Sequence, residues 1–142
     1  MKSSPKLLLV VLVLGLTMGI GMDLPRVAQA ADMIPQISFE DLKKMIDDKK
    51  NDFLIVDVRP KGVYDTSHIM GALSFPWGNP LKSPGNLPRD KRLIFYCDCA
   101  HEEDAISVAT QMKQNFRYTD VAVLKGSWTK WRVLGYPVEQ KK

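Results

Sequence analysis

The chain has 142 residues, a formal net charge of +4 and two cysteines. This length suits a single ordinary domain, and two cysteines cannot build the disulfide framework typical of small exported proteins. The basic residues are scattered along the chain, which argues against a nucleic-acid-binding surface because phosphate recognition needs clustered Lys and Arg.

The first thirty residues have the pattern of a secretory signal peptide. Lys2 and Lys6 precede an uncharged stretch over 7–22 that is rich in Leu and Val, and a small-x-small cleavage site follows at 28–30. The apolar stretch is shorter than the roughly 20 residues that span a bilayer. We therefore expect residues 1–30 to be cleaved and the protein to be exported, either to the periplasm or out of the cell. An uncleaved membrane anchor is the alternative, and only then would the membrane be a partner.

The rest of the chain divides into three parts. A linker is expected over 31–36, a domain over 37–139 and a short polar tail over 140–142. A domain of this size can bury roughly two thirds of its surface without disulfides. We expect it to be monomeric.

Strands and helices are predicted to alternate through the domain. Ser38 is a favourable N-cap for a helix whose apolar positions recur at helical spacing from Phe39 to Ile46. Buried-type strands are expected at 53–56, 72–75, 92–96 and 121–124, further helices at 105–116 and 128–134, and a loop at 76–89. This alternation predicts an α/β fold with a parallel sheet that has helices on both faces. Ligands of such sheets bind at the carboxyl ends of the strands.

Cys97 stands at such a strand end, directly before a polar loop and a predicted helix. The helix N-terminus contributes about half a positive charge, which favours the thiolate, the form of cysteine that attacks. Backbone amides of residues 98–103 could also hold a negatively charged persulfide. A buried structural cysteine is the alternative, but the polar surroundings favour exposure. The loop residues that follow are Asp98, Cys99, Ala100, His101, Glu102 and Glu103.

Three motifs resemble those of the rhodanese family. Asp57-Val58-Arg59, followed by the His68–Ala72 turn, is similar to the first signature of that family. The segments 124–131 and 135–138 are similar to its C-terminal signature, and Cys97 stands where the family keeps its catalytic cysteine. The resemblance spans most of the chain after the predicted signal. It implies a three-layer fold with about five parallel strands.

The resemblance also implies an activity. Rhodanese domains are sulfurtransferases, so Cys97 would accept a sulfane sulfur from a donor and pass it to a thiol, the partners being small molecules or proteins. The other matching residues would be structural, with Asp57 pairing with Arg59 and His68 tying the turn at Gly71. Gly126 and Trp131 belong to the structural part of the second motif.

The cysteine loop departs from the family pattern because it contains four carboxylates and no Arg or Lys. Repulsion of a dianion predicts poor activity with thiosulfate and a preference for a neutral or protein-bound donor. Glu102, Glu103 and Asp104 could instead point outward as a solvated first helical turn, and the sequence leaves both arrangements open. Glu103 also occupies the position of the arginine in Cys-x5-Arg phosphatase loops, which excludes that activity.

Cys99 gives the loop a second thiol. It could act as a resolving thiol that attacks the inner sulfur of a Cys97 persulfide, expels sulfide and leaves a disulfide, or it could pack without reacting. The alternative function is therefore a non-catalytic module that binds a partner or senses redox state through these two cysteines. No metal is expected, because Cys97, Cys99 and His101 lack a clear fourth ligand. No cofactor is expected either, since no glycine-rich phosphate loop follows a strand.

Overall fold

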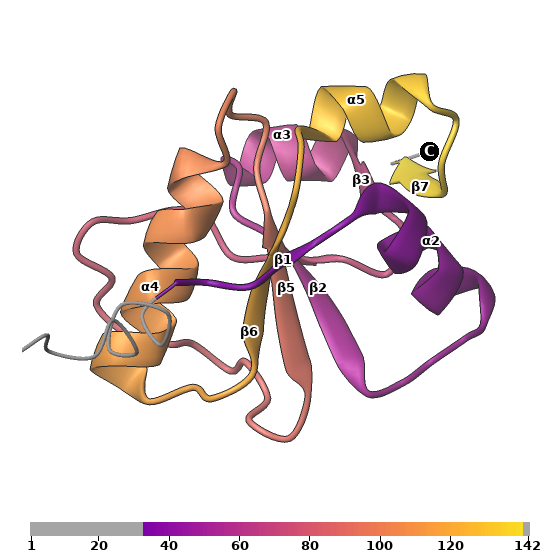
Figure 1. The fold of residues 1–142 in the computed structure, drawn as a ribbon. Coiled ribbons are helices and arrows are strands. Elements are labelled where there is room, and N and C mark those ends of the chain that lie inside the picture. The colour runs from indigo at the N-terminus through magenta and orange to yellow at the C-terminus, as the bar shows by residue number, and fades with distance from the viewer. Residues whose placement is uncertain (1–32, 141–142) are drawn as a thin grey trace, which may run out of the picture. The chain divides into compact units, whose positions relative to one another are not determined.

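The computed structural model describes residues 33–140 (Figure 1). The predicted signal segment and the last two residues of the predicted tail lie outside this range. In chain order the elements are β1 (Gln36–Ile37), α2 (Phe39–Asp47), β2 (Phe53–Asp57), α3 (Lys61–Thr66), β3 (Ser67–Ile69), β4 (Leu73–Ser74), β5 (Arg92–Tyr96), α4 (Glu103–Phe116), β6 (Val121–Leu124), α5 (Trp128–Val133) and β7 (Val138–Gln140). None of the helices within 33–140 is long and apolar enough to cross a membrane.

Five strands form a parallel sheet in the order β1-β6-β5-β2-β4, which confirms the predicted α/β fold. β5 and β6 match the predicted strands 92–96 and 121–124, and every residue of β6 is buried. Continuous apolar runs are typical of strands covered on both faces. Because β5 is the middle strand, the residue that follows it lies at the centre of the carboxyl edge.

The two faces of the sheet carry separate apolar clusters. Successive side chains of a strand point to opposite faces, so Leu93 and Phe95 of β5 pack on the α4 side, while Ile94 and Tyr96 pack on the side of α2 and α5. Figure 1 shows α4 on one face of the sheet and α2 on the other. The core thus fixes the rotation of β5 and the direction in which its last residue leaves the sheet.

The first helix begins as predicted. The Ser38 hydroxyl accepts a hydrogen bond from the Asp41 amide at 3.1 Å, and Phe39 and Leu42 are buried. α3 was not predicted, whereas α4 and α5 differ from expectation only at their ends, since α4 begins at Glu103 rather than at residue 105 and α5 ends at Val133.

Short strands at both ends of the domain correct the predicted boundaries. Gln36, predicted as the end of the linker, pairs with Val123 in β1, and Gln140, predicted as the start of the tail, pairs with Ser67 in the antiparallel β3–β7 ribbon. These strands have two or three residues and pair through their backbones with distant segments. They therefore have no apolar periodicity for the sequence to show.

Candidate functional site

Cys97 directly follows β5 at the carboxyl edge of the sheet, but it is buried, with 2% of its surface exposed. The expectation of exposure was wrong. The Cys97 side chain belongs to the apolar cluster on the α4 side, and its carbonyl accepts a hydrogen bond from the Trp128 amide at 3.0 Å. A segment distant in sequence thus lies against the strand end, and the polar residues next to Cys97 could not reveal this.

One backbone amide of the loop faces the Cys97 thiol. The Cys99 amide lies 3.4 Å from Cys97 Sγ, whereas the His101 amide donates to Glu103 Oε2 at 3.1 Å. Ala100 and His101 are exposed at the tip of the loop. The structure therefore brings fewer backbone amides of residues 98–103 to the Cys97 thiol than predicted. An N–H donor to sulfur favours the anionic forms of a thiol or persulfide.

Two of the loop carboxylates bind the segment between β6 and α5. Asp98 accepts from both the amide and the hydroxyl of Thr129, each at 2.9 Å. Glu102 Oε1 accepts from the Gly126 amide at 2.8 Å. Sequence reasoning did not foresee these contacts, because their partners lie 24 and 31 residues away.

The other two carboxylates are engaged within the loop. Glu103 is exposed on the first turn of α4, as one of the two predicted arrangements requires. Backbone hydrogen bonds, from its own amide and from that of His101, lower its pKa. Asp104 is half-buried and its Oδ2 accepts from the Cys99 thiol at 3.3 Å. The four carboxylates therefore do not form one solvated face.

Cys99 is half-buried and protonated at neutral pH. Burial and, after it, a side-chain hydrogen bond with Cys97 raise the pKa of Cys99 to about 12. Thiol–disulfide exchange requires the attacking sulfur as thiolate. The environment of Cys99 thus disfavours the resolving role.

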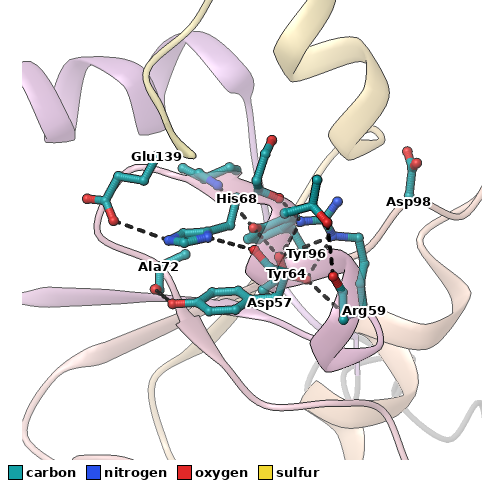
Figure 2. A network of polar contacts seen from close by, with 12 residues as sticks. Asp57, Arg59, Tyr64, His68, Ala72, Tyr96, Asp98 and Glu139 are labelled. Carbon is teal, nitrogen blue, oxygen red and sulfur yellow. Dashed lines mark hydrogen bonds and ion pairs between the residues drawn. The ribbon is translucent and has the colours of Figure 1, made fainter. Parts of the chain in front are cut away.

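The expected pair of Asp57 and Arg59 is present and buried below the loop (Figure 2). Arg59 Nη2 lies 2.6 Å from Asp57 Oδ2 and 2.8 Å from the Ser67 carbonyl oxygen. The Tyr96 hydroxyl donates to Asp57, and the Arg59 guanidinium lies 4.4 Å from the centre of the Trp128 ring. Burial opposes the charge of Arg59, but the hydrogen bond and charge of Asp57 outweigh it and raise the pKa of Arg59.

His68 reaches the Gly71 turn through a residue that the sequence did not single out, Glu139. His68 Nδ1 lies 2.9 Å from the Tyr64 carbonyl oxygen, and Nε2 lies 3.2 Å from Glu139 Oε2. The Gly71 amide donates to Glu139 Oε1 at 3.0 Å. Figure 2 shows the His68 ring above the Tyr64 ring, and the ring centres are 3.9 Å apart. Since Glu139 is 71 residues from His68, no local pattern could have identified it.

Gly126 and Trp131 both lie in closely packed surroundings. Gly126 has φ +118°, and a Cβ atom there would lie 2.4 Å from Phe39 Cζ. Trp131 is fully buried, and its indole N–H donates to the Pro137 carbonyl oxygen at 3.0 Å. No cluster of three or more His, Cys, Asp or Glu residues within 33–140 is arranged to hold a metal ion.

The family model of the rhodanese-like domain matches residues 38–133. The BH2092 protein from Bacillus halodurans has a similar structure, with a TM-score of 0.67, 26% identity and 81% of each chain covered.

Two curated relatives are longer proteins. The chain is 29% identical over 89 residues to an HTH-type transcriptional regulator of Mycobacterium tuberculosis, covering 61% of this chain and 37% of the regulator. It is 26% identical over 89 residues to an adenylyltransferase and sulfurtransferase of Meyerozyma guilliermondii, covering 58% of this chain and 21% of that protein. The chain thus spans less than half the length of either relative.

Proposed function

This chain belongs to the rhodanese-like domain family, and from that premise we propose that it carries sulfane sulfur as a persulfide on Cys97. The observation that carries the proposal is the position of Cys97 at the carboxyl end of the central strand, with the Cys99 amide 3.4 Å from its sulfur. The relative named as a sulfurtransferase supports the same chemistry.

The proposed reaction has two displacement steps. The Cys97 thiolate attacks the outer sulfur of a donor persulfide R–S–SH, the S–S bond breaks, and R–S⁻ leaves with the electron pair. The new Cys97–S–SH group loses its proton, and the Cys99 amide stabilises the anion. An acceptor thiolate then attacks the outer sulfur, becomes the persulfide and regenerates the Cys97 thiolate. No net oxidation occurs, and no cofactor is required.

The loop favours donors without a double negative charge. Four carboxylates lie within residues 97–104, and this stretch contains no Lys or Arg. At an effective dielectric constant of ~20, two unit charges 4 Å apart repel by roughly 4 kcal/mol. A neutral polysulfide or a protein-bound persulfide is therefore the proposed donor, and a thiol on a small molecule or protein the proposed acceptor.

A redox-sensing or partner-binding module that uses Cys97 and Cys99 is the second candidate. Two free cysteines separated by one residue favour it, because their side chains can approach closely. The raised pKa of Cys99 works against it, since a disulfide forms through the thiolate. Sulfur transfer is accordingly the first proposal.

Intact mass spectrometry separates the two functions. The protein lacking residues 1–30 is incubated with a polysulfide, alongside the Cys97→Ser variant. Sulfur transfer predicts a gain of one sulfur atom that is absent in the variant. An untreated protein that already has the mass of the disulfide form, and gains no sulfur, would favour the redox module.

We also propose that the protein acts outside the cytoplasm, because residues 1–30 have the pattern of a signal peptide. N-terminal sequencing of the full-length protein after expression in a bacterial host tests this. A mature N-terminus at Ala31 in the periplasmic fraction is expected. An intact N-terminus in the membrane fraction would indicate an anchor.

A further inference from the structure

The segment 126–129 touches both ends of the loop that begins at Cys97. At one end, the Trp128 amide donates to the Cys97 carbonyl oxygen and Thr129 donates twice to Asp98. At the other end, the Gly126 amide donates to Glu102. The loop is therefore held at its start and its finish by one short stretch of backbone.

These contacts complete the first turn of α5. The first amides of a helix lack intrahelical partners and need other acceptors. Ser127 caps the Lys130 amide with its own hydroxyl at 3.3 Å. The Cys97 loop supplies the acceptors for the Trp128 and Thr129 amides, so α5 and the loop stabilise one another.

Glu102 also sets where α4 begins. Its backbone is left-handed, with φ 57° and ψ 22°, a conformation that is uncommon for residues other than glycine. Its carbonyl accepts from the Ile106 amide at 2.8 Å, the first turn of the helix. The hydrogen bond from the Gly126 amide holds the Glu102 side chain at the start of this helix. Glu102 therefore links the loop, α4 and the β6–α5 turn.

We propose that Asp98 and Glu102 are positioning residues for sulfur transfer. Their carboxylates hold the loop against segment 126–129 and thereby keep the Cys99 amide within hydrogen-bond distance of Cys97 Sγ. This inference rests on the proposed function. It assigns these two acidic side chains a geometric role as hydrogen-bond acceptors, which an amide oxygen could also fill, in addition to the negative charge that they bring to the loop.

The test compares variants that remove the acceptor with variants that keep it. Asp98→Ala and Glu102→Ala remove the acceptor, whereas Asp98→Asn and Glu102→Gln keep an oxygen at the same position and lose the charge. Asp120→Ala is the control, because the Asp120 carboxylate pairs with Arg92 on the surface and not with the loop. Each protein is assayed for transfer from a polysulfide to a thiol, and thermal unfolding verifies folding.

Alkylation of Cys97 by iodoacetamide gives a second readout that needs no sulfur transfer. Its rate at one pH, read by fragmentation of the peptide, follows how firmly the loop is held, because only 2% of the Cys97 surface is exposed. A wild-type protein that accepts no sulfur would reject the proposed function and leave this readout intact. A failure of the proposed function can thus be told apart from a failure of the positioning role of Asp98 and Glu102.

We expect the alanine variants to lower kcat by about 10- to 100-fold, the effect of a misplacement near 1 Å, with little change in KM. Alkylation of the buried Cys97 should become faster as the loop loosens, and the amide variants should recover both properties. If an alanine variant does not fold, Thr129→Val removes the hydrogen bond from the Thr129 hydroxyl to Asp98 and should also lower kcat.

Unchanged alkylation and transfer in the folded alanine and valine variants would overturn the proposal. Amide variants as defective as the alanine variants would overturn it too.

Discussion

Asp57 and Tyr96 are register partners on the neighbouring strands β2 and β5, and the Tyr96 hydroxyl donates across this pair to the Asp57 carboxylate. Tyr96 immediately precedes Cys97, so the buried ion pair of Asp57 and Arg59 contacts the residue next to the proposed sulfur carrier. Burial raises the pKa of Tyr96 above its ordinary value, and the negative charge of Asp57 adds to the effect. Tyr96 therefore remains a hydrogen-bond donor throughout the neutral range.

The first prediction concerns this ion pair. Arg59→Met leaves the fully buried Asp57 carboxylate without its cation, and the free energy of unfolding should fall by about 3–5 kcal/mol. Arg92→Met is the matched control, since the pair of Arg92 and Asp120 is exposed and worth at most about 1 kcal/mol. Urea unfolding curves measure both. Equal losses of unfolding free energy in the two variants would show that burial does not make the loss of the Asp57 partner more costly.

The second prediction separates the two cysteines. Cys97→Ser should abolish persulfide formation, whereas Cys99→Ser should change the transfer rate by less than about tenfold, or roughly 1.4 kcal/mol in the barrier. The reason is that the raised pKa of Cys99 keeps its thiol protonated, while serine at this position retains the backbone amide that lies 3.4 Å from Cys97 Sγ. Single-turnover and multiple-turnover kinetics with a polysulfide provide the measurement. A Cys99→Ser protein that stops after one turnover would instead assign Cys99 a chemical step.

The third prediction is a dependence of stability on pH. The folded-state pKa of Cys99 is about 12, against an ordinary value of 9.0, so the folded protein binds more protons than the unfolded chain between these values. Stability should therefore be fully present below pH 9 and decline as the pH rises toward 12. Unfolding curves of the wild type and Cys99→Ser isolate this contribution, because Tyr96 contributes equally to both. If the stabilities of the wild type and of Cys99→Ser change with pH in the same way, the raised pKa of Cys99 is ruled out.

The fourth prediction compares two glycines. Gly126→Ala places a Cβ atom 2.4 Å from Phe39 Cζ on backbone with φ +118°, and it should destabilise the protein by about 1–3 kcal/mol. Gly62→Ala lies in α3 with nothing within 4 Å of the new atom, so it should be neutral or stabilise by up to about 1 kcal/mol. Thermal unfolding of both variants measures the difference. A tolerated Gly126→Ala would mean that the Phe39 ring can move aside.

The fifth prediction concerns the sulfur donor. kcat/KM should be lower for thiosulfate than for a neutral polysulfide, and added salt should narrow the gap because it screens the repulsion between thiosulfate and the acidic loop. Steady-state assays at low and high ionic strength measure this. A preference for thiosulfate at low salt would refute the proposed donor class.

The sequence predicted the centre of the fold well and its margins poorly. β5 and β6 were predicted at their full length because buried parallel strands appear as unbroken apolar runs. β1, β3 and β7 were missed, since strands of two or three residues depend on backbone pairing and not on side-chain pattern. The six-residue helix α3 has no buried residue and so gave no apolar signal.

The candidate site divides in the same way. Asp57 and Arg59 are two residues apart, and the resemblance to the rhodanese signature implied their pairing. The partners of Asp98, Glu102 and His68 lie 31, 24 and 71 residues away, and these contacts exist only once the chain has folded. The burial of Cys97 likewise depends on contacts distant in sequence, because its side chain belongs to a buried cluster that includes Val58 and Val123.

The β3–β7 ribbon limits where this protein can be shortened for biochemical work. A chain trimmed after residue 133 would retain the whole stretch that the family model matches, yet it would lose the strand that pairs with Ser67–Ile69 and the carboxylate that holds both His68 and the Gly71 amide. An expression fragment should therefore extend through Gln140. A purification tag at the carboxyl end needs a spacer so that β7 can still pair.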